Sequence, residues 1–485
     1  MPDVPPRAAL AAVSRIAIDE LLDAVPELLV LSERIVASGH EVALVGGSVR
    51  DAVRQGTAVD IDLATSARPQ QVLAALHGWA DAVWDIGIEF GTVGARRGEH
   101  HFEITTYRSD AYDRSTRKPE VTYGDSLLED LRRRDFTINA MAVMLPDRTF
   151  IDPFGGLSDL AAGVLRTPAT PEQSFADDPL RMMRAARFVA QLGVSVTPEV
   201  RSALGAMADR ISMVSAERVR DELSKLLLAD SPRSGLELMV DSGLADHVLP
   251  ELPALRLEID EHHRHKDVYE HSLIVLEQAI DLESSHEPAI PPDLVLRLAA
   301  LLHDIGKPRT RRFETGGRVS FHHHEVVGAK LVRRRLTALR YPRAVIDQVT
   351  ALVELHLRFH GYGGGAWTDS AVRRYVRDAG EQVVRLHKLT RADCTTRNPR
   401  KAAALRRTYD DLESRIGELT EAEELASIRP DLDGNEIMTT LGIGPGREVG
   451  EAYRWLMERR LDEGPLGRER AQRELLVWWT DRSSS

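Results

Sequence analysis

The stretch HEVALVGGSVRDAVRQGTAVDIDLATS, residues 40–66, decides the fold of the N-terminal part of the chain. It opens with an apolar run, EVALV, which ends in Gly46 and Gly47, and the following SVRDAVRQG has helical character. A strand, a glycine turn and a helix together can hold a phosphate, because glycine lets backbone N–H groups approach an anion that the helix N-terminus also attracts. The glycine pair alone is weak evidence for such a site.

Two aspartates follow this turn. VDIDLAT alternates as a strand does, so Asp60 and Asp62 project to the same face. Adjacent like charges repel each other unless a divalent cation neutralises them, and ligand sets made of oxygen atoms suit Mg²⁺. Glu103, in the stretch HHFEITTYR, offers a third carboxylate from a neighbouring strand. Three carboxylates predict Mg²⁺-dependent phosphoryl or nucleotidyl transfer, and a solvated edge strand is the alternative.

Length and composition limit the number of domains and the class of protein. A chain of 485 residues is long enough for several modules, and one cysteine, Cys394, excludes an internal disulfide. Acidic residues interrupt the N-terminal apolar stretches, and no run reaches the roughly 18 apolar residues that a membrane helix needs. We therefore expect a cytoplasmic protein with no membrane segment.

The net charge of −12 argues at first against a polyanionic partner. Local basic clusters weaken that objection, although each cluster alone is more often a solvated helix face. The clusters lie at residues 132–134, 309–312, 333–335 and 397–407.

Five motifs stand in the order of the class II CCA-adding enzymes and bacterial poly(A) polymerases, and the chain resembles that family. The match continues through SAERVRDELSKLLL at residues 215–228, and the tail resembles the actinobacterial type with an HD domain. The motifs are GGSVRD at 46–51, DID at 60–62, RRDFTINAMA at 133–142, DPFGG at 152–156 and DDPLRMMRAARF at 177–188.

The resemblance gives roles to particular residues. It implies that Asp60, Asp62 and Glu103 are catalytic, with Mg²⁺ on the two aspartates. It also implies that the polar segment at residues 107–131 is a loop that helps to switch from C to A addition. The implied nucleotide-binding residues are Gly46, Gly47 and Arg50 in the turn, Arg134, Asp135 and Asn139 near the ribose, Asp178 and Arg181 at the base, and Arg184 at the triphosphate.

A second constellation lies farther along the chain, in the order H…HD…D. His303 is followed at once by Asp304 in HDIGK, which is hard to explain as packing. The pattern resembles the HD-domain metal phosphohydrolases, and imidazole with carboxylate suits Ni, Mn, Fe, Co or Zn. The predicted ligands are His271, His303, Asp304 and Asp393, and His324 and His356 could extend the site to a second metal.

We predict an α+β protein in which an N-terminal nucleotidyltransferase head with a small mixed β-sheet precedes an all-helical neck, body, HD domain and tail. Asp178, Arg181 and Arg184 are expected on one face of a single helix, since they are spaced by three residues. The predicted domains are the head at 25–165, the neck and body at 166–255, the HD domain at 256–395 and a tRNA-binding tail at 396–485.

The predicted reaction adds CMP, CMP and AMP, from CTP and ATP, to the tRNA 3′ end without a template. The expected RNA contact is the tRNA 3′ end with the acceptor and T arms, and the HD domain implies a 2′,3′-cyclic phosphodiesterase, 2′-nucleotidase or phosphatase activity. The alternatives to a CCA-adding enzyme are a poly(A) polymerase, an A-adding or CC-adding enzyme, and a regulator whose head only binds RNA. The sequence leaves open whether the protein is a monomer or a homodimer.

Overall fold

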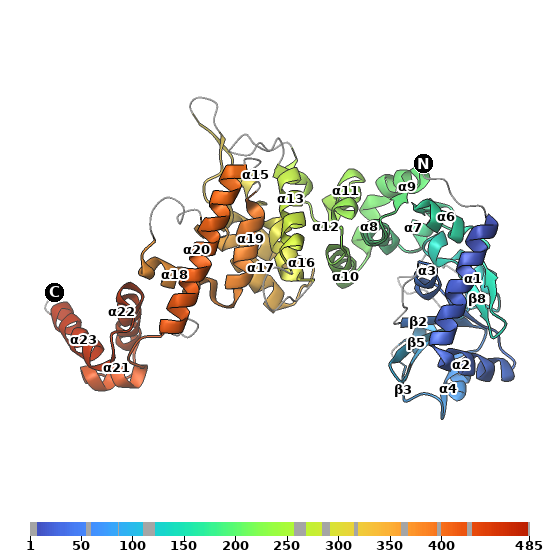
Figure 1. Cartoon of the computed structure of the whole chain (residues 1–485), viewed down its shortest axis with the longest axis horizontal. Helices are drawn as coiled ribbons and strands as arrows, with labels where there is room; N and C mark the ends of the chain where they lie inside the picture. The colour runs from blue at the N-terminus through green and yellow to red at the C-terminus, as the bar shows by residue number, and fades with distance from the viewer. Residues whose placement is uncertain are drawn as a thin grey trace. The chain divides into compact units, whose positions relative to one another are not determined.

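A computed structural model describes residues 7–54, 60–85, 87–109, 122–256, 268–283, 292–314, 319–359, 367–394, 399–423 and 429–483. The chain divides into two compact units, Met1–Val248 and Leu249–Ser485 (Figure 1). The first holds a mixed sheet with helices and the second is mainly helical, so the predicted fold class is confirmed. No helix in these ranges is both long and apolar enough to cross a membrane.

The head is built on a sheet with the strand order β3-β4-β5-β2-β1-β8-β9. β2 and β5 are parallel, while the other neighbouring pairs are antiparallel. The strands are β1 (Val42–Val45), β2 (Asp60–Thr65), β3 (Ala82–Trp84), β4 (Thr92–Arg97), β5 (His100–Thr106), β8 (Ala142–Leu145) and β9 (Thr149–Ile151).

Apolar side chains cover the sheet on both sides. Ile61 and Leu63 of β2 join one cluster with residues of α1 (Arg7–Ala24), α2 (Pro26–Ala37) and α4 (Pro69–Leu76). Because side chains alternate along a strand, Asp62 lies on the opposite face. That face carries a second, smaller cluster, which includes residues of α5 (Leu127–Arg132).

Helix α1 belongs to the head. Its residues Ile18, Leu21 and Leu22 are buried in the same core as β1 and β2. The head therefore includes residues before position 25, where the sequence alone placed its start. Between β6 (Arg108–Ser109) and β7 (Thr122–Tyr123), residues 110–121 of the expected switching loop lie outside the described part of the chain.

The helical part of the first unit centres on α8, which packs against α10 and α11. Its N-terminal neighbour α7 has Pro at its first turn and a Thr170 cap, the signals that begin a helix. The elements are α6 (Gly156–Ala162), α7 (Pro171–Asp177), α8 (Leu180–Leu192), α9 (Pro198–Met207), α10 (Ala216–Leu227), α11 (Arg233–Asp241) and α12 (Leu244–Val248), with β10 (Val164–Leu165) paired to β11 (Ser195–Val196).

In the second unit, five helices pack on one another around a group of buried histidines and aspartates. The first of them begins three residues before His271, where the sequence had suggested its start. These helices are α13 (Val268–Asp281), α14 (Leu294–Leu302), α16 (His324–Ala338), α17 (Arg343–Leu355) and α19 (Val383–Asp393).

The remaining helices of the second unit carry the C-terminal part of the chain. Three of them share a small core of their own, with Leu432, Ile437 and Leu456 buried. The elements are α18 (Asp369–Ala379), α20 (Pro399–Glu423), α21 (Gly434–Leu441), α22 (Arg447–Glu463) and α23 (Arg468–Ser483).

Candidate nucleotidyltransferase and metal sites

The glycine turn lies beside the carboxylate of Asp62. Gly46 has a positive φ of 68° and precedes α3 (Gly47–Val53). A Cβ on Gly46 would lie 3.0 Å from Arg134 Nη1 and 3.5 Å from Asp62 Oδ2. The expected strand, turn and helix are present, but α3 has only seven residues. The guanidinium groups of Arg50 and Arg134 also lie at this turn, where they pair with Asp51 and Asp130.

The turn gives a sharp mutational test. Gly46→Ala should lower nucleotide addition, by up to about 10²-fold, because a methyl group there would lie 3.0 Å from Arg134 Nη1 and displace that guanidinium by a few tenths of an ångström. Gly39→Ala is the matched control, since Gly39 also has positive φ (85°) but its Cβ would meet nothing within 4 Å. Steady-state addition rates and melting temperatures of both variants check this. An equal loss in both would assign the effect to backbone strain alone.

Two of the three carboxylates that the sequence predicts to be catalytic lie on neighbouring strands. Asp62 on β2 is the register partner of Glu103 on β5, so the two side chains leave the sheet side by side. Ser48 Oγ accepts a hydrogen bond from the backbone N–H of Asp62 at 2.9 Å, which ties the glycine turn to β2. Asp60 occupies the first position of β2, and its side chain lies outside the described part of the chain. Two adjacent carboxylates need a counter-charge, and oxygen ligands of this kind fit Mg²⁺.

The RRDFTINAMA motif connects the turn to α8. Asn139 Oδ1 accepts a hydrogen bond from Arg50 Nη1 at 2.7 Å, and Asn139 Nδ2 donates to Asp135 Oδ1 at 3.0 Å. Asp135 in turn pairs with Arg184 Nη2 at 2.5 Å. Burial alone would raise the pKa of the Asp135 carboxyl, but Arg184 and Asn139 hold it below its usual range. The structure thus joins four of the predicted residues in one continuous network.

The predicted base-reading pair is arranged differently from the sequence expectation. Asp178 lies in the break between α7 and α8, with extended φ and ψ, so it does not share a helix with Arg181. Its Oδ1 accepts from the backbone N–H of Leu180, and its Oδ2 pairs with Arg218 of α10 at 3.0 Å. Arg181 donates to Ser174 Oγ at 2.9 Å. The prediction that Asp178 shares a helix face with Arg181 is therefore wrong, and the two side chains are positioned by other partners.

Sequence reasoning missed the residues of α10 that face α8. Glu222 pairs with Arg187 at 2.6 Å, and both side chains are largely buried. Arg187 lies over the ring of Phe188 at 4.2 Å, and Arg50 and Arg184 lie over the same ring at 5.2 and 5.7 Å. The signal was available in SAERVRDELSKLLL, where Arg218 and Glu222 are four residues apart on one face of a helix.

Arg218 should influence nucleotide choice because it holds the Asp178 carboxylate. Arg218→Ala is expected to lower the ratio of CMP to UMP incorporation by about tenfold, while the pair, being partly exposed, changes stability by less than about 1 kcal/mol. Arg220→Ala is the control, because Arg220 lies two residues away on α10 and pairs with its neighbour Asp221. Single-nucleotide incorporation with CTP and UTP measures the ratio. An unchanged ratio would show that Asp178 needs no support from α10.

The second predicted constellation also assembles. His271, His303 and Asp393 form one group and Asp304, His324 and His356 another, with ligand atoms within 4.8 Å in each. Asp304 lies between the groups: its Oδ2 is 3.2 Å from His303 Nε2, and its Oδ1 is 3.2 Å from His324 Nε2. All six predicted HD residues are therefore brought together, and both groups are within reach of one carboxylate.

Three of these histidines are oriented by the backbone. The Nδ1 atoms of His303, His324 and His356 lie 2.7–2.9 Å from the carbonyl oxygens of Ala300, Phe321 and Val353. A carbonyl can only accept, so each Nδ1 carries a hydrogen and each Nε2 is left to face the cluster. This arrangement is the one expected of metal ligands.

The cluster passes a chemical test of fit for a cation. His324 Nε2 and His356 Nε2 lie only 3.3 Å apart, and so do His271 Nε2 and His303 Nε2. Two imidazole lone pairs at that distance repel unless a proton or a metal ion lies between them. Burial alone would lower the pKa of His303, but Asp304 and Asp393 outweigh it and raise that pKa to about 10. Asp304 and Asp393 therefore stabilise a positive charge on His303, and a bound cation would supply that positive charge in place of the proton.

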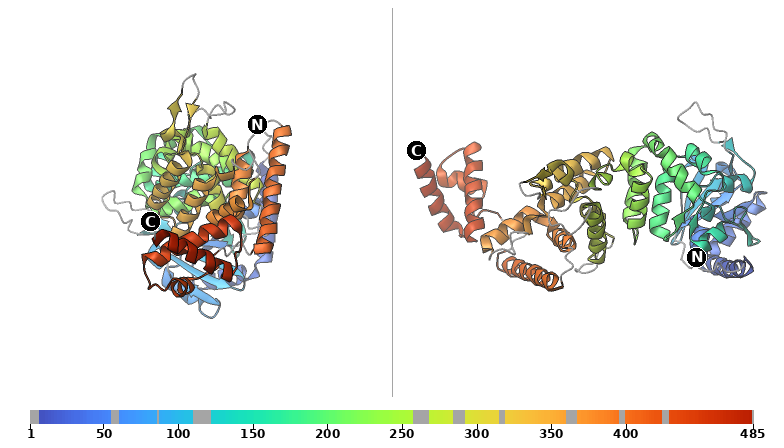
Figure 2. Two further views of the ribbon diagram at one scale, coloured as in Figure 1. Left: turned by 90° about the vertical axis from the view of Figure 1, so that its left-hand side faces the viewer. Right: turned by 90° about the horizontal axis from the view of Figure 1, so that it is seen from above.

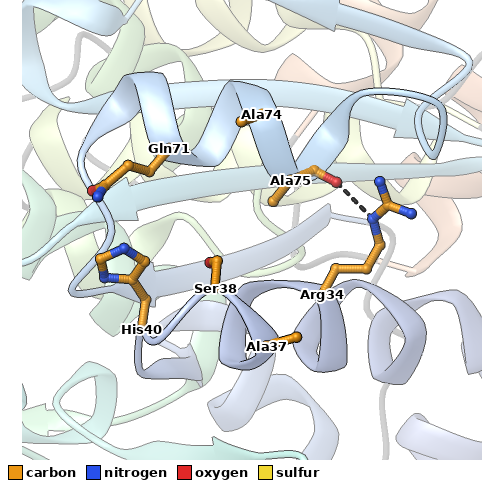
Figure 3. Close-up of a pocket in the computed structure, with 7 residues that line it drawn as sticks. All are labelled: Arg34, Ala37, Ser38, His40, Gln71, Ala74 and Ala75. Atoms are coloured by element: carbon orange, nitrogen blue, oxygen red, sulfur yellow. Dashed lines mark hydrogen bonds between the residues drawn. The ribbon is translucent and has the colours of Figure 1, made fainter.

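A separate cleft lies on the head, between α2 and α4 (Figure 3). Arg34 closes one end by donating from Nε to the carbonyl oxygen of Ala75 at 2.7 Å, and His40 and Gln71 line the other end. Helices α2 and α4 cover the sheet face opposite Asp62, so this cleft contains none of the predicted site residues.

Comparison with known protein families agrees with this geometry. The poly A polymerase head domain matches residues 42–166, the probable RNA and SrmB-binding site of polymerase A matches 193–255, and the HD domain matches 268–398. The head and its carboxylates define a nucleotidyltransferase of the poly(A) polymerase type.

Similar proteins of known name identify the kind of nucleotidyltransferase to which the chain is related. The A-adding tRNA nucleotidyltransferase of Deinococcus radiodurans is 35% identical over 450 residues, covering 91% of this chain and 96% of that protein. The CCA-adding enzyme of Leuconostoc mesenteroides is 41% identical over 240 residues, and the match spans 57% of its length. The chain belongs to the family of tRNA nucleotidyltransferases and poly(A) polymerases. The actinobacterial subtype stays a prediction.

A solved structure extends the likeness to nearly the whole chain. The Bacillus stearothermophilus CCA-adding enzyme in complex with CTP has a TM-score of 0.65 and 26% identity, covering 95% of this chain and 98% of that one. The Thermotoga maritima CCA-adding enzyme complexed with tRNA shares the fold, with a TM-score of 0.60 at 20% identity.

Proposed function

We propose that the protein adds CMP, CMP and AMP, from CTP and ATP, to the 3′ end of tRNA. The observation that carries this proposal is the network from Arg50 through Asn139 and Asp135 to Arg184. It joins the turn beside the carboxylate strand to the helix that follows Asp178, so the reacting phosphate and the base would be held by one connected set of residues. The family membership and the solved CCA-adding enzyme with CTP support the same reading.

Each part of the head has a distinct task in this proposal. Asp60, Asp62 and Glu103 would hold Mg²⁺, which supplies activation of the 3′-hydroxyl and neutralisation of the triphosphate. Arg134, Asp135 and Asn139 would contact the ribose, and Arg184 the triphosphate. Asp178 can accept from the exocyclic amino group at N4 of C or N6 of A, a position at which U and G carry a carbonyl oxygen. The Asp178 carboxylate and the Arg181 guanidinium would then select both correct nucleotides with one pair of side chains.

An A-adding enzyme is the second candidate, because the relative that matches 91% of the chain is named A-adding. The deciding experiment incubates tRNA transcripts that end before CCA, after C or after CC with labelled CTP, ATP or both. Two additions of C and one of A, followed by a stop, establish CCA addition. Use of ATP alone, and only on the CC-ending transcript, would establish A addition. A long run of A would establish a poly(A) polymerase.

We further propose that the HD cluster hydrolyses phosphate esters at damaged RNA ends. Water would add across one P–O bond of a 2′,3′-cyclic phosphate to leave a phosphomonoester. His271, His303, Asp304 and Asp393 would hold a cation of Ni, Mn, Fe, Co or Zn, with His324 and His356 for a second one. Such a cation supplies Lewis acidity at the ester.

The remaining proposals concern the RNA partner, the cellular location and the oligomeric state. The tail would contact the acceptor and T arms of tRNA, and the chain would act in the cytoplasm, where tRNA and nucleotides are found. Size measurement of the purified protein with and without tRNA distinguishes a monomer from a homodimer.

A further inference from the structure

A small hairpin projects from the helices that carry the HD cluster. It consists of β12 (Arg312–Phe313) and β13 (Val319–Ser320), which pair antiparallel with Phe313 opposite Val319. The short helix α15 (Lys307–Thr310) leads into it from the HD motif. In the left view of Figure 2 the two strands project beyond the bundled helices of their own unit.

Both ends of the hairpin begin at the HD cluster, the group of six histidines and aspartates described above. On the side of β12, Lys307 is buried and its Nζ lies 2.8 Å from Asp304 Oδ2. On the side of β13, the carbonyl oxygen of Phe321 lies 2.9 Å from Nδ1 of His324. Lys307 Nζ also lies 5.6 Å from the ring centroid of Phe321, so the two stems meet. The hairpin therefore has a fixed position at the rim of the cluster.

The exposed part of the hairpin combines an aromatic ring with guanidinium groups. The side chain of Phe313 is 74% exposed, and Arg311 Cζ lies 5.1 Å from its ring centroid. Arg309 and Arg312 are also exposed. The neighbouring acid Glu314 lies 3.5 Å from His322, and so is directed toward the other stem. Rings that stack on bases, beside arginines that bind phosphates, are the usual elements of single-stranded nucleic acid binding.

We propose that this hairpin binds the terminal nucleotides of a single-stranded RNA 3′ end and presents its terminal phosphate to the HD cluster. The inference rests on the proposed phosphohydrolase and names the residues that would select an RNA end over a free nucleotide. Phe313 stacks on a base, and Arg309 and Arg312 contact the phosphates that precede the terminal one.

The test compares two substrates on the metal-loaded full-length protein. One is 2′,3′-cyclic AMP, and the other is a tRNA transcript that ends in a 2′,3′-cyclic phosphate. Phe313→Ala should raise KM for the RNA by about tenfold, since one stacked base contributes about that factor, and Arg312→Ala should raise it by a similar factor through loss of a charge-assisted phosphate contact; both should leave kcat/KM for cyclic AMP unchanged. Phe313→Trp should retain a low KM. Arg343→Ala is the control for charge, because the Arg343 side chain is 94% exposed on α17.

Other outcomes contradict the proposal in distinguishable ways. Equal loss on both substrates would make the hairpin a structural part of the cluster, and no change on either would exclude RNA binding in favour of another partner. RNA carrying 4-thiouridine at its 3′-terminal position should crosslink to residues 309–314 of the wild-type protein. If neither substrate is hydrolysed but this crosslink forms and Phe313→Ala abolishes it, the hairpin proposal stands and the phosphohydrolase is wrong.

Discussion

Asp62→Ala should lower nucleotide addition by about 10³-fold or more while leaving hydrolysis at the HD cluster unchanged. Asp62 lies beside Glu103 across the parallel pair β2 and β5, and its Oδ2 faces the glycine turn. Loss of this carboxylate removes a ligand of the proposed Mg²⁺ site, and metal ions of this kind supply several kcal/mol of transition-state stabilisation. Asp60→Ala should behave in the same way. Addition of labelled CMP to a tRNA transcript at saturating nucleotide measures the loss.

The controls separate chemistry from folding. Asp62→Asn keeps the shape of the side chain and the hydrogen bond from its backbone to Ser48, so it should be equally inactive yet melt at the wild-type temperature. Asp147→Ala removes an exposed carboxylate from the turn between β8 and β9 and should be silent. Addition by Asp62→Asn at more than a few per cent of the wild-type rate would show that Asp62 is not a metal ligand.

The sequence predicted the elements of the head that depend on local pattern. Alternation in VDIDLAT and HHFEITTYR was enough to predict two strands, because a strand has a fixed two-residue period, and the structure shows that the strands of Asp62 and Glu103 are neighbours. The glycine turn was also predicted, and the structure gives its reason: Gly46 has a positive φ of 68°, and a Cβ there would lie 3.0 Å from Arg134 Nη1.

Partners that come from distant segments could not be predicted in this way. Asp178, Arg181 and Arg184 have helical spacing, but Pro179 follows Asp178 and disfavours helical φ and ψ at that aspartate. The aspartate is free to pair with Arg218, which lies 40 residues farther along the chain. The start of the head at α1 was missed for a similar reason, since helical periodicity does not show which core a helix joins.

In the HD cluster, too, the motif order predicted the ligands, whereas the contacts of buried neighbours could be found only in the structure. The order H…HD…D predicted four ligands, with His324 and His356 as an extension to a second metal, and the structure brings all six residues together. Lys307 was not assigned a role, although it stands in the same HDIGK motif, because nothing in its spacing shows that it is buried against Asp304. Because Lys307 pairs with Asp304, a substitution of Asp304 can change the stability of the protein as well as its metal binding.

Asp304→Asn should abolish hydrolysis at the HD cluster, by about 10³-fold or more, and lower metal content in both ligand groups at once. The reason is its position: one carboxylate oxygen lies 3.2 Å from His303 Nε2 and the other 3.2 Å from His324 Nε2. Nucleotide addition should remain at the wild-type rate, since the head has its own carboxylates. His322→Ala is the control, because His322 is an exposed histidine near the cluster. Metal content per chain and hydrolysis of 2′,3′-cyclic AMP are the measurements.

Asp304→Asn and Asp304→Ala both remove the negative charge beside the buried Lys307 ammonium, and Asp304→Ala also removes the oxygen that can accept its hydrogen bond. Removing one partner of a buried ion pair costs about 3–5 kcal/mol, so either variant could lose hydrolysis by unfolding, and Asp304→Ala more readily. Asp304→Ala with Lys307→Met removes both charges and should restore the melting temperature without restoring hydrolysis. Recovery of hydrolysis in the double variant would show that Asp304 serves only to neutralise Lys307, and the assignment of metal ligands would then be wrong.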